Sequence, residues 1–149
     1  MKSAGQNAGW PGFELGITEK EYNQLQEVVL TVKHRNQWFT PDSVRNSLTS
    51  WSKLLTKSNL EHWVSDHNFP VGGKKVAIVM AGNLPLVGFH DLLSVVVSGN
   101  IALVKMSSDD NVLLPCLLQI LFNYCPELKE RIQLLDKLVE FDAVIATGS

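Results

Sequence analysis

Apolar residues recur at helical spacing along the first part of the chain. A capping box at Thr18–Glu21 is followed by apolar residues three or four positions apart, which predicts a helix that ends near His34. Thr40–Pro41 combines a side chain that can cap a helix with a proline at the first helical position. A second capping box at Ser58–Glu61 predicts a short third helix. This part of the chain is therefore expected to be helical.

The pattern changes after a turn signal at Phe69–Gly73 to short apolar runs separated by amphipathic stretches. Val76–Met80 is rich in β-branched residues and lacks polar alternation, which predicts a central strand covered on both faces. A helix with apolar residues at helical spacing should follow and end at Gly99, in a C-terminal capping position. Ile101–Met106 is the next predicted strand.

The remaining segments continue this alternation. Asn111–Tyr124 predicts a helix if Pro115 falls in its opening turn, and two weaker strands are predicted at Ile132–Leu135 and Ala143–Ala146. Strands that alternate with helices build parallel sheets. The predicted fold is α/β, with an N-terminal helical segment followed by a partial Rossmann-like parallel sheet. The expected organisation is a flexible tail over 1–16, a helical segment over 17–70 and a nucleotide-binding domain over 71–149. Because the sequence stops directly after a predicted strand, it is expected to be a fragment of a longer polypeptide.

Composition narrows the possible functions of the chain. With 149 residues, 45% hydrophobic, it is long enough for a globular core, and its net charge of -2 does not favour a nucleic acid as partner. The apolar runs are too short for a membrane span, and the N-terminus lacks the apolar core of a secretory signal, so a cytoplasmic protein is expected. Cys116 and Cys125 have neither the number nor the spacing of a disulfide framework or a zinc site, and no metal is expected.

Three loops follow the carboxyl ends of predicted parallel strands, at 81–85, 107–110 and 147–149. Ligands of open α/β sheets lie at this edge, because backbone N–H groups and helix N-termini point towards it. The spacing therefore predicts one ligand site, although the dinucleotide fingerprint Gly-x-Gly-x-x-Gly is absent.

The residues of these loops carry a family resemblance. The stretch from Lys75 to Lys105, with its Gly-Asn-Leu-Pro loop, resembles the cofactor-binding region of the fatty acyl-CoA reductases of the bacterial bioluminescence type (LuxC-like), a branch of the aldehyde dehydrogenase superfamily. Asn36–Pro41 and Phe141–Ser149 resemble two further motifs of the same reductases. The resemblance implies an acyl-CoA substrate, a nicotinamide cofactor, an aldehyde product, a cysteine thioester intermediate and possible homo-oligomers.

Asn83 matches the superfamily asparagine whose amide donates a hydrogen bond to the thioester or hemithioacetal oxygen. Acyl transfer to a cysteine builds negative charge on that oxygen, and an oriented donor stabilises it. Without the resemblance, the favoured interpretation of Asn83 is structural: it tolerates a left-handed turn or caps the next helix.

The resemblance also assigns cofactor contacts. Lys105 matches a lysine that contacts the adenosine ribose, and Gly148 and Ser149 match a Gly-Ser beneath the pyrophosphate. In the superfamily, an acidic residue three positions beyond this lysine favours NAD. Here the third position holds Ser108, which has no charge and favours NADPH. A shift of one residue would instead place Asp109 at the ribose and favour NADH. The predicted cofactor-binding residues are Ala81, Gly82, Lys105, Ser107, Ser108, Asp109, Gly148 and Ser149.

The catalytic cysteine of the resembling reductases has no counterpart in this sequence. Cys116 and Cys125 are interpreted as small buried hydrophobes. His90 and Asp91 are adjacent on a predicted helix and are not expected to pair directly. The other histidines are expected at the surface and the tryptophans at packed helical positions; they are His34, His62, His67, Trp38, Trp51 and Trp63.

These observations lead to one favoured interpretation and two alternatives. The favoured interpretation is the cofactor-binding part of a fatty acyl-CoA reductase that uses NADPH, inactive without its cysteine domain. The first alternative keeps the fold in an NAD(P)-dependent dehydrogenase that oxidises aldehydes. The second is a nucleotide-binding or scaffold module without catalytic activity.

Overall fold

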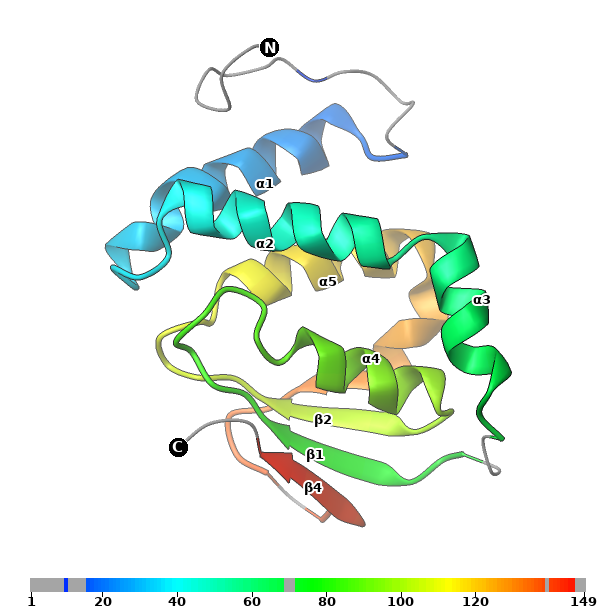
Figure 1. The fold of residues 1–149 in the computed structure, drawn as a ribbon. Helices are drawn as coiled ribbons and strands as arrows, with labels where there is room; N and C mark the ends of the chain where they lie inside the picture. Colours follow the sequence, from blue (N-terminus) through cyan, green and yellow to red (C-terminus); the bar gives the residue numbers. More distant parts are fainter. Residues whose placement is uncertain (1–9, 11–15, 69–71, 139, 147–149) are drawn as a thin grey trace.

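The sheet of this protein lies beneath a layered stack of helices, as a computed structural model shows (Figure 1). The structure describes residue 10 and residues 16–68, 72–138 and 140–146. The elements in this part of the chain are α1 (Glu19–Thr31), the 3-10 helix η2 (Val32–His34), α2 (Pro41–Leu54), α3 (Lys57–Ser65), β1 (Lys75–Val79), α4 (Phe89–Val97), β2 (Ile101–Lys105), α5 (Leu113–Tyr124), the 3-10 helix η3 (Pro126–Glu130), β3 (Ile132–Leu134) and β4 (Ala143–Ala146).

The strands form a parallel sheet in the order β3-β2-β1-β4. In its register, Ile78 lies beside Val104 on one side and Ile145 on the other. Ile78 and Val104 belong to the core under the helices, whereas their neighbours Ala77 and Leu103 point to the opposite face and are also buried. Strand β1 is therefore central and buried on both faces, as its composition predicts. The predicted α/β fold with a partial Rossmann-like parallel sheet is confirmed.

Helices α4 and α5 lie against one face of the sheet, and α1 and α2 lie above them (Figure 1). One hydrophobic core runs through all these layers, because Val29 and Phe39 of the helical segment join Ile78 and Val104 of the sheet in the same cluster. The helical segment and the sheet therefore share their packing. Over the described residues, every helix is too short or too polar to cross a lipid bilayer.

A buried carboxylate joins the start of α1 to the end of α5. Glu21 forms the predicted capping box with Thr18: the backbone N–H of Glu21 donates to Thr18 Oγ1 at 3.3 Å, and the Thr18 N–H donates to Glu21 Oε2 at 2.8 Å. The same carboxylate accepts hydrogen bonds from Asn123 Nδ2 at 2.7 Å and from the Tyr124 hydroxyl at 3.1 Å. These hydrogen bonds hold its pKa at about 2, below the usual 4.5, with the bond from Asn123 as the largest cause.

Two of the predicted helix starts differ in outcome. Thr40 caps α2 as expected, with Pro41 in the first turn. The predicted cap of the third helix at Ser58 is wrong, because Thr56 is the N-cap and its side chain accepts from the Asn59 N–H at 3.2 Å. Asn59 Nδ2 also donates to the Lys53 carbonyl at 3.0 Å, so contacts with the end of α2 place the start of α3 earlier than the capping-box pattern indicates.

The end of α4 packs tightly against the entry to the sheet. Gly99 has a φ of +85° and follows the helix, as predicted, and its carbonyl accepts from the Gly73 N–H at 3.0 Å. A Cβ on Gly72 would lie only 2.1 Å from the Gly99 carbonyl oxygen, so this approach requires glycine. The rest of the predicted turn, 69–71, lies outside the described residues.

Candidate functional site

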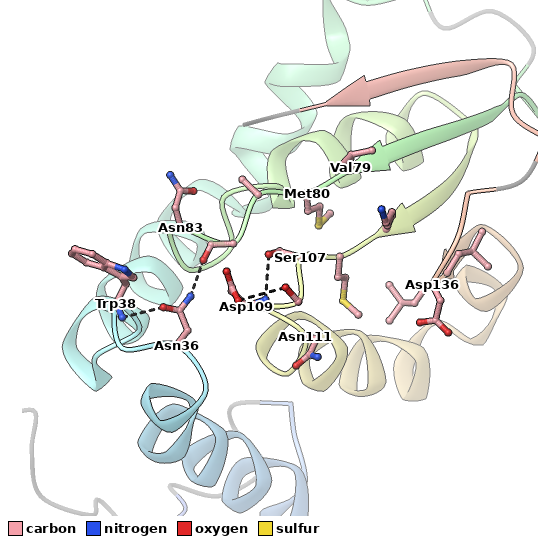
Figure 2. A pocket seen from close by; sticks show the side chains of 16 residues that line it. Asn36, Trp38, Val79, Met80, Asn83, Ser107, Asp109, Asn111 and Asp136 are labelled. Carbon is pink, nitrogen blue, oxygen red and sulfur yellow. Dashed lines mark hydrogen bonds between the residues drawn. The ribbon is translucent and has the colours of Figure 1, made fainter. Parts of the chain in front are cut away.

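A cleft of about 890 Å³ opens at the carboxyl ends of β1, β2 and β3 (Figure 2). The end of β2 and the loops after β1 and β2 bring most of the predicted site residues to its wall: Ala81, Gly82, Asn83, Lys105, Ser107, Ser108 and Asp109. The predicted residues Gly148 and Ser149 lie outside the described residues. The volume is within the range of about 300–1,000 Å³ typical of small-molecule and cofactor sites.

The loops after β1 and β2 touch at Gly82. A Cβ at this position would lie 2.5 Å from Ser107 Oγ and 2.7 Å from Ser107 Cβ, closer than a side chain can approach without a shift of the neighbouring loop. The Met80 N–H also donates to the Lys105 carbonyl at 3.0 Å, just beyond the paired strands. Glycine at position 82 therefore allows the two loops to share one cleft wall.

Asn83 is exposed on the cleft wall. It neither adopts a left-handed turn conformation nor caps the next helix, the two structural roles considered for it. The N-cap of α4 is Gly88, and α4 has no side-chain capping bond. The positive φ among the described residues of this loop belongs to Leu86, at 61°, whose buried side chain anchors the turn. The amide of Asn83 is therefore available to a ligand in the cleft.

The loop after β2 carries a carboxylate beside two hydroxyls. The Asp109 N–H donates to Ser107 Oγ at 3.2 Å, and the Ser108 hydroxyl approaches Asp109 Oδ1 at 3.5 Å (Figure 2). Ser108 and Asp109 both face solvent and line the same cleft as Lys105. A ribose at the end of β2 would therefore meet hydroxyl, carboxylate and ammonium groups.

Two lining residues come from the helical segment and were not predicted as site residues. Asn36, 6% exposed, donates from Nδ2 to the Gly82 carbonyl at 2.7 Å and accepts at Oδ1 from the Trp38 N–H at 3.0 Å. Trp38 was expected at a packed helical position, but it lies between α1 and α2 with 79% of its surface exposed. Both residues belong to the Asn36–Pro41 motif, so the resemblance marked the segment without indicating that it lines the cleft.

Asp110, between the lining residues Asp109 and Asn111, is buried and was also missed. It is 9% exposed, and burial raises its pKa from 3.8 to about 6, partly offset by a hydrogen bond from the Leu113 N–H. Its Oδ1 atom is buried without a hydrogen-bond partner. The run Ser-Ser-Asp-Asp-Asn is polar throughout, so the sequence does not indicate that Asp110 is the buried residue among them.

The remaining candidates for nucleophilic or metal chemistry do not form a site. Cys116 is buried, as predicted, and burial raises the pKa of its thiol, which disfavours a nucleophilic thiolate. Cys125, predicted to be buried as well, is only partly buried at the end of α5. His90 Nδ1 approaches Asp91 Oδ1 to 3.8 Å, closer than expected for adjacent helical residues but too far for a hydrogen bond. Three or more potential metal ligands do not cluster anywhere in the described part of the chain. The other histidines, His34, His62 and His67, are exposed as expected.

Comparison with known proteins agrees with this arrangement. A family model described as acyl-CoA reductase (LuxC) matches residues 14–148. Searches of the curated proteins and of the solved structures gave no match. The family implies an oxidoreductase with an acyl-CoA substrate and a nicotinamide cofactor. Because the match spans the helical segment and the sheet together, the chain belongs to the LuxC family of acyl-CoA reductases.

Proposed function

We propose that this chain is the cofactor-binding part of an enzyme that reduces a fatty acyl-CoA thioester to an aldehyde with NADPH. The catalytic cysteine is contributed by residues outside this sequence, and the chain alone is inactive. The observation that carries the proposal is the cleft at the carboxyl ends of the strands, where Asn83 of the loop after β1 lines the same cavity as Lys105, the last residue of β2.

The side chains of this cleft fit a nicotinamide dinucleotide. Lys105 and the hydroxyl of Ser108 can hydrogen-bond ribose or phosphate oxygens, while Met106 offers polarisable apolar surface to a planar ring. The bound cofactor supplies a hydride to the acyl carbon. The chain binds and orients the cofactor, and the contact between the two loops at Gly82 keeps their polar side chains in the same wall of the cleft.

Asn83 is proposed as the oxyanion donor. When a thiolate attacks the thioester carbonyl, negative charge develops on the carbonyl oxygen, and a fixed amide N–H contributes about 3 kcal/mol to lowering the barrier. Its exposure on the cleft wall, without a capping role for α4, supports this assignment.

The choice between NADPH and NADH depends on Ser108 and Asp109. Ser108 at the third position after Lys105 favours NADPH, because it carries no charge that would repel a 2′-phosphate. Asp109 lines the same cleft, and its carboxylate favours the free 2′-hydroxyl of NADH. In an Asp109→Asn variant, affinity for NADPH should therefore rise relative to NADH, as two parallel calorimetric titrations would measure.

The roles of Asn83 and Lys105 can be separated kinetically in the intact reductase. Asn83→Ala should lower kcat about 100-fold with little change in the cofactor KM, whereas Lys105→Ala should chiefly raise the cofactor KM. Lys129→Ala, on η3 and outside the cleft, is the matched control and should change neither. The reverse pattern would refute the assignment, and an enzyme that oxidises aldehydes but does not reduce acyl-CoA thioesters would refute the proposed reaction.

A further inference from the structure

We propose that Trp38 is a ligand-binding residue whose indole stacks on a planar ring of the nucleotide in this cleft. This inference rests on the proposed function and extends the cofactor site to the helical segment.

The first observation is the exposure of Trp38 at the rim of the cleft (Figure 2). Its surface is 79% exposed, whereas the other helical-segment tryptophans Trp51 and Trp63 contact the rings of Phe89 and His90 at centroid distances of 4.9 and 5.8 Å. Within the described part of the chain, the indole of Trp38 has neither a ring partner nor a hydrogen-bond partner. A large aromatic surface therefore lies unpaired at the rim of the cleft.

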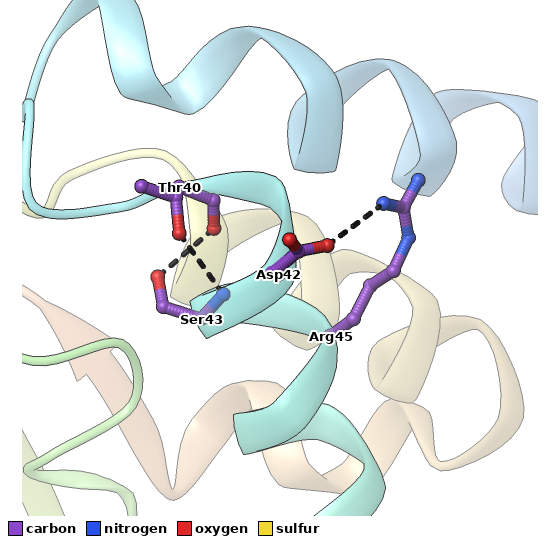
Figure 3. Close-up of polar contacts among 4 residues, drawn as sticks. All are labelled: Thr40, Asp42, Ser43 and Arg45. Atoms are coloured by element: carbon purple, nitrogen blue, oxygen red, sulfur yellow. Dashed lines mark hydrogen bonds and ion pairs between the residues drawn. The ribbon is translucent and has the colours of Figure 1, made fainter. Parts of the chain in front are cut away.

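The second observation is that the backbone of Trp38 is fixed on both sides. Its N–H donates to Asn36 Oδ1 at 3.0 Å, and its carbonyl accepts from the Ser43 hydroxyl at 3.2 Å. Ser43 is held in turn by Thr40 at the start of α2 (Figure 3). The next residue, Phe39, is fully buried in the core. Because the main chain is already ordered, a ligand that stacks on this indole loses little affinity to loop ordering.

The third observation is the chemistry of the neighbouring walls. Asn83 and Met106 line the same cavity as Trp38. An indole face attracts flat heteroaromatic rings by stacking and attracts cationic rings more strongly, which includes oxidised nicotinamide. The expected partner is thus the nicotinamide or the adenine ring of a nucleotide.

Binding titrations on the intact chain test this inference. Trp38→Ala should weaken NADPH binding about 3- to 10-fold in calorimetry, and Trp38→Phe, which keeps a ring, should retain most of the affinity. Leu54→Ala is the matched control, since Leu54 is an exposed apolar residue of helix α2 outside the cleft. Thermal melts of the variants should match the parent, because the side chain of Trp38 is not part of the core.

Two further ligands identify the ring. Adenosine 2′,5′-bisphosphate carries the adenine end of NADPH without nicotinamide, and coenzyme A carries adenine on the substrate. If Trp38→Ala loses affinity for NADPH alone, Trp38 stacks on nicotinamide. If it loses affinity for the bisphosphate as well, Trp38 stacks on the adenine of the cofactor. If it loses affinity for coenzyme A alone, Trp38 stacks on the adenine of the substrate.

The outcomes distinguish the stacking role of Trp38 from the proposed cofactor site itself. If the parent and Trp38→Ala bind every ligand equally, the stacking role is overturned while the cofactor site stands. If Trp38→Phe loses as much affinity as Trp38→Ala, ring stacking is likewise refuted. If the parent binds none of the three ligands, both proposals fail.

Discussion

Asn36 donates a hydrogen bond of 2.7 Å from its side-chain amide to the carbonyl of Gly82, 46 residues further along the chain (Figure 2). The bond ties the connection between α1 and α2 to the loop that carries Asn83. Ser47 adds a second tie, since its hydroxyl donates to the Pro85 carbonyl at 2.8 Å. The helical segment thus holds the loop from which the proposed oxyanion donor projects.

Loss of the Asn36 amide should destabilise the fold. Asn36→Ala leaves the Gly82 carbonyl without this donor, and we expect the free energy of unfolding in urea to fall by about 1–3 kcal/mol. Asn36→Asp keeps the acceptor for the Trp38 N–H but places a carboxylate against the Gly82 carbonyl, so it should cost more stability than Asn36→Ala. The control is Asn59→Ala, which breaks an exposed side-chain bond and should cost less than about 1 kcal/mol. Equal losses at both positions would contradict a special role for Asn36.

A methyl group at position 82 should force the two cleft loops apart. Gly82→Ala places a Cβ 2.5 Å from Ser107 Oγ, and we expect a loss of about 1–3 kcal/mol in stability together with weaker NADPH binding. Adding Ser107→Gly removes the crowded atoms and should restore part of the stability, measured as a double-mutant cycle in urea. If the two substitutions were additive, the close contact would not be the cause of the loss.

Glu21 should make the protein more stable above pH 4.5 than near pH 2. Its pKa is about 2 in the folded chain and 4.5 as the ordinary value, so the unfolded state binds more protons in this window and stability falls as the pH is lowered through it. Glu21→Gln should remove this part of the pH dependence in melting curves recorded from pH 2 to 7. If the melting temperature of this variant fell between pH 4.5 and 2 as much as that of the parent, the Glu21 carboxylate would not be the titrating group.

Asp110 should have the opposite effect. Burial raises its pKa from 3.8 to about 6, so the folded state binds more protons between these values and stability decreases as the pH rises through them. Asp110→Asn keeps an oxygen that can accept from the Leu113 N–H but carries no charge. We expect it to melt at a higher temperature than the parent at pH 7, with the difference shrinking as the pH falls from 6 to 3.8. A variant that is less stable than the parent at pH 7 would contradict this account.

Elements with strong local signals were predicted well from the sequence. The capping box of Thr18 and Glu21, the Thr40–Pro41 helix start and the glycine after α4 act within a few residues, so their geometry depends little on the rest of the chain. The third helix was placed less well, because Thr56 and Ser58 are both acceptable caps and contacts with α2 favour the first.

The sequence by itself determined that helices precede a parallel sheet and that polar loops follow the carboxyl ends of its strands, because apolar periodicity and turn residues act locally. Only the tertiary structure decided that Asn36 holds Gly82, that Trp38 is exposed at the rim of the cleft and that Asp110 is buried. Each of these depends on segments far apart in sequence or on the packing of a loop against a helix. Burial and partner choice for a polar or aromatic side chain are set by those neighbours, and no local pattern encodes them.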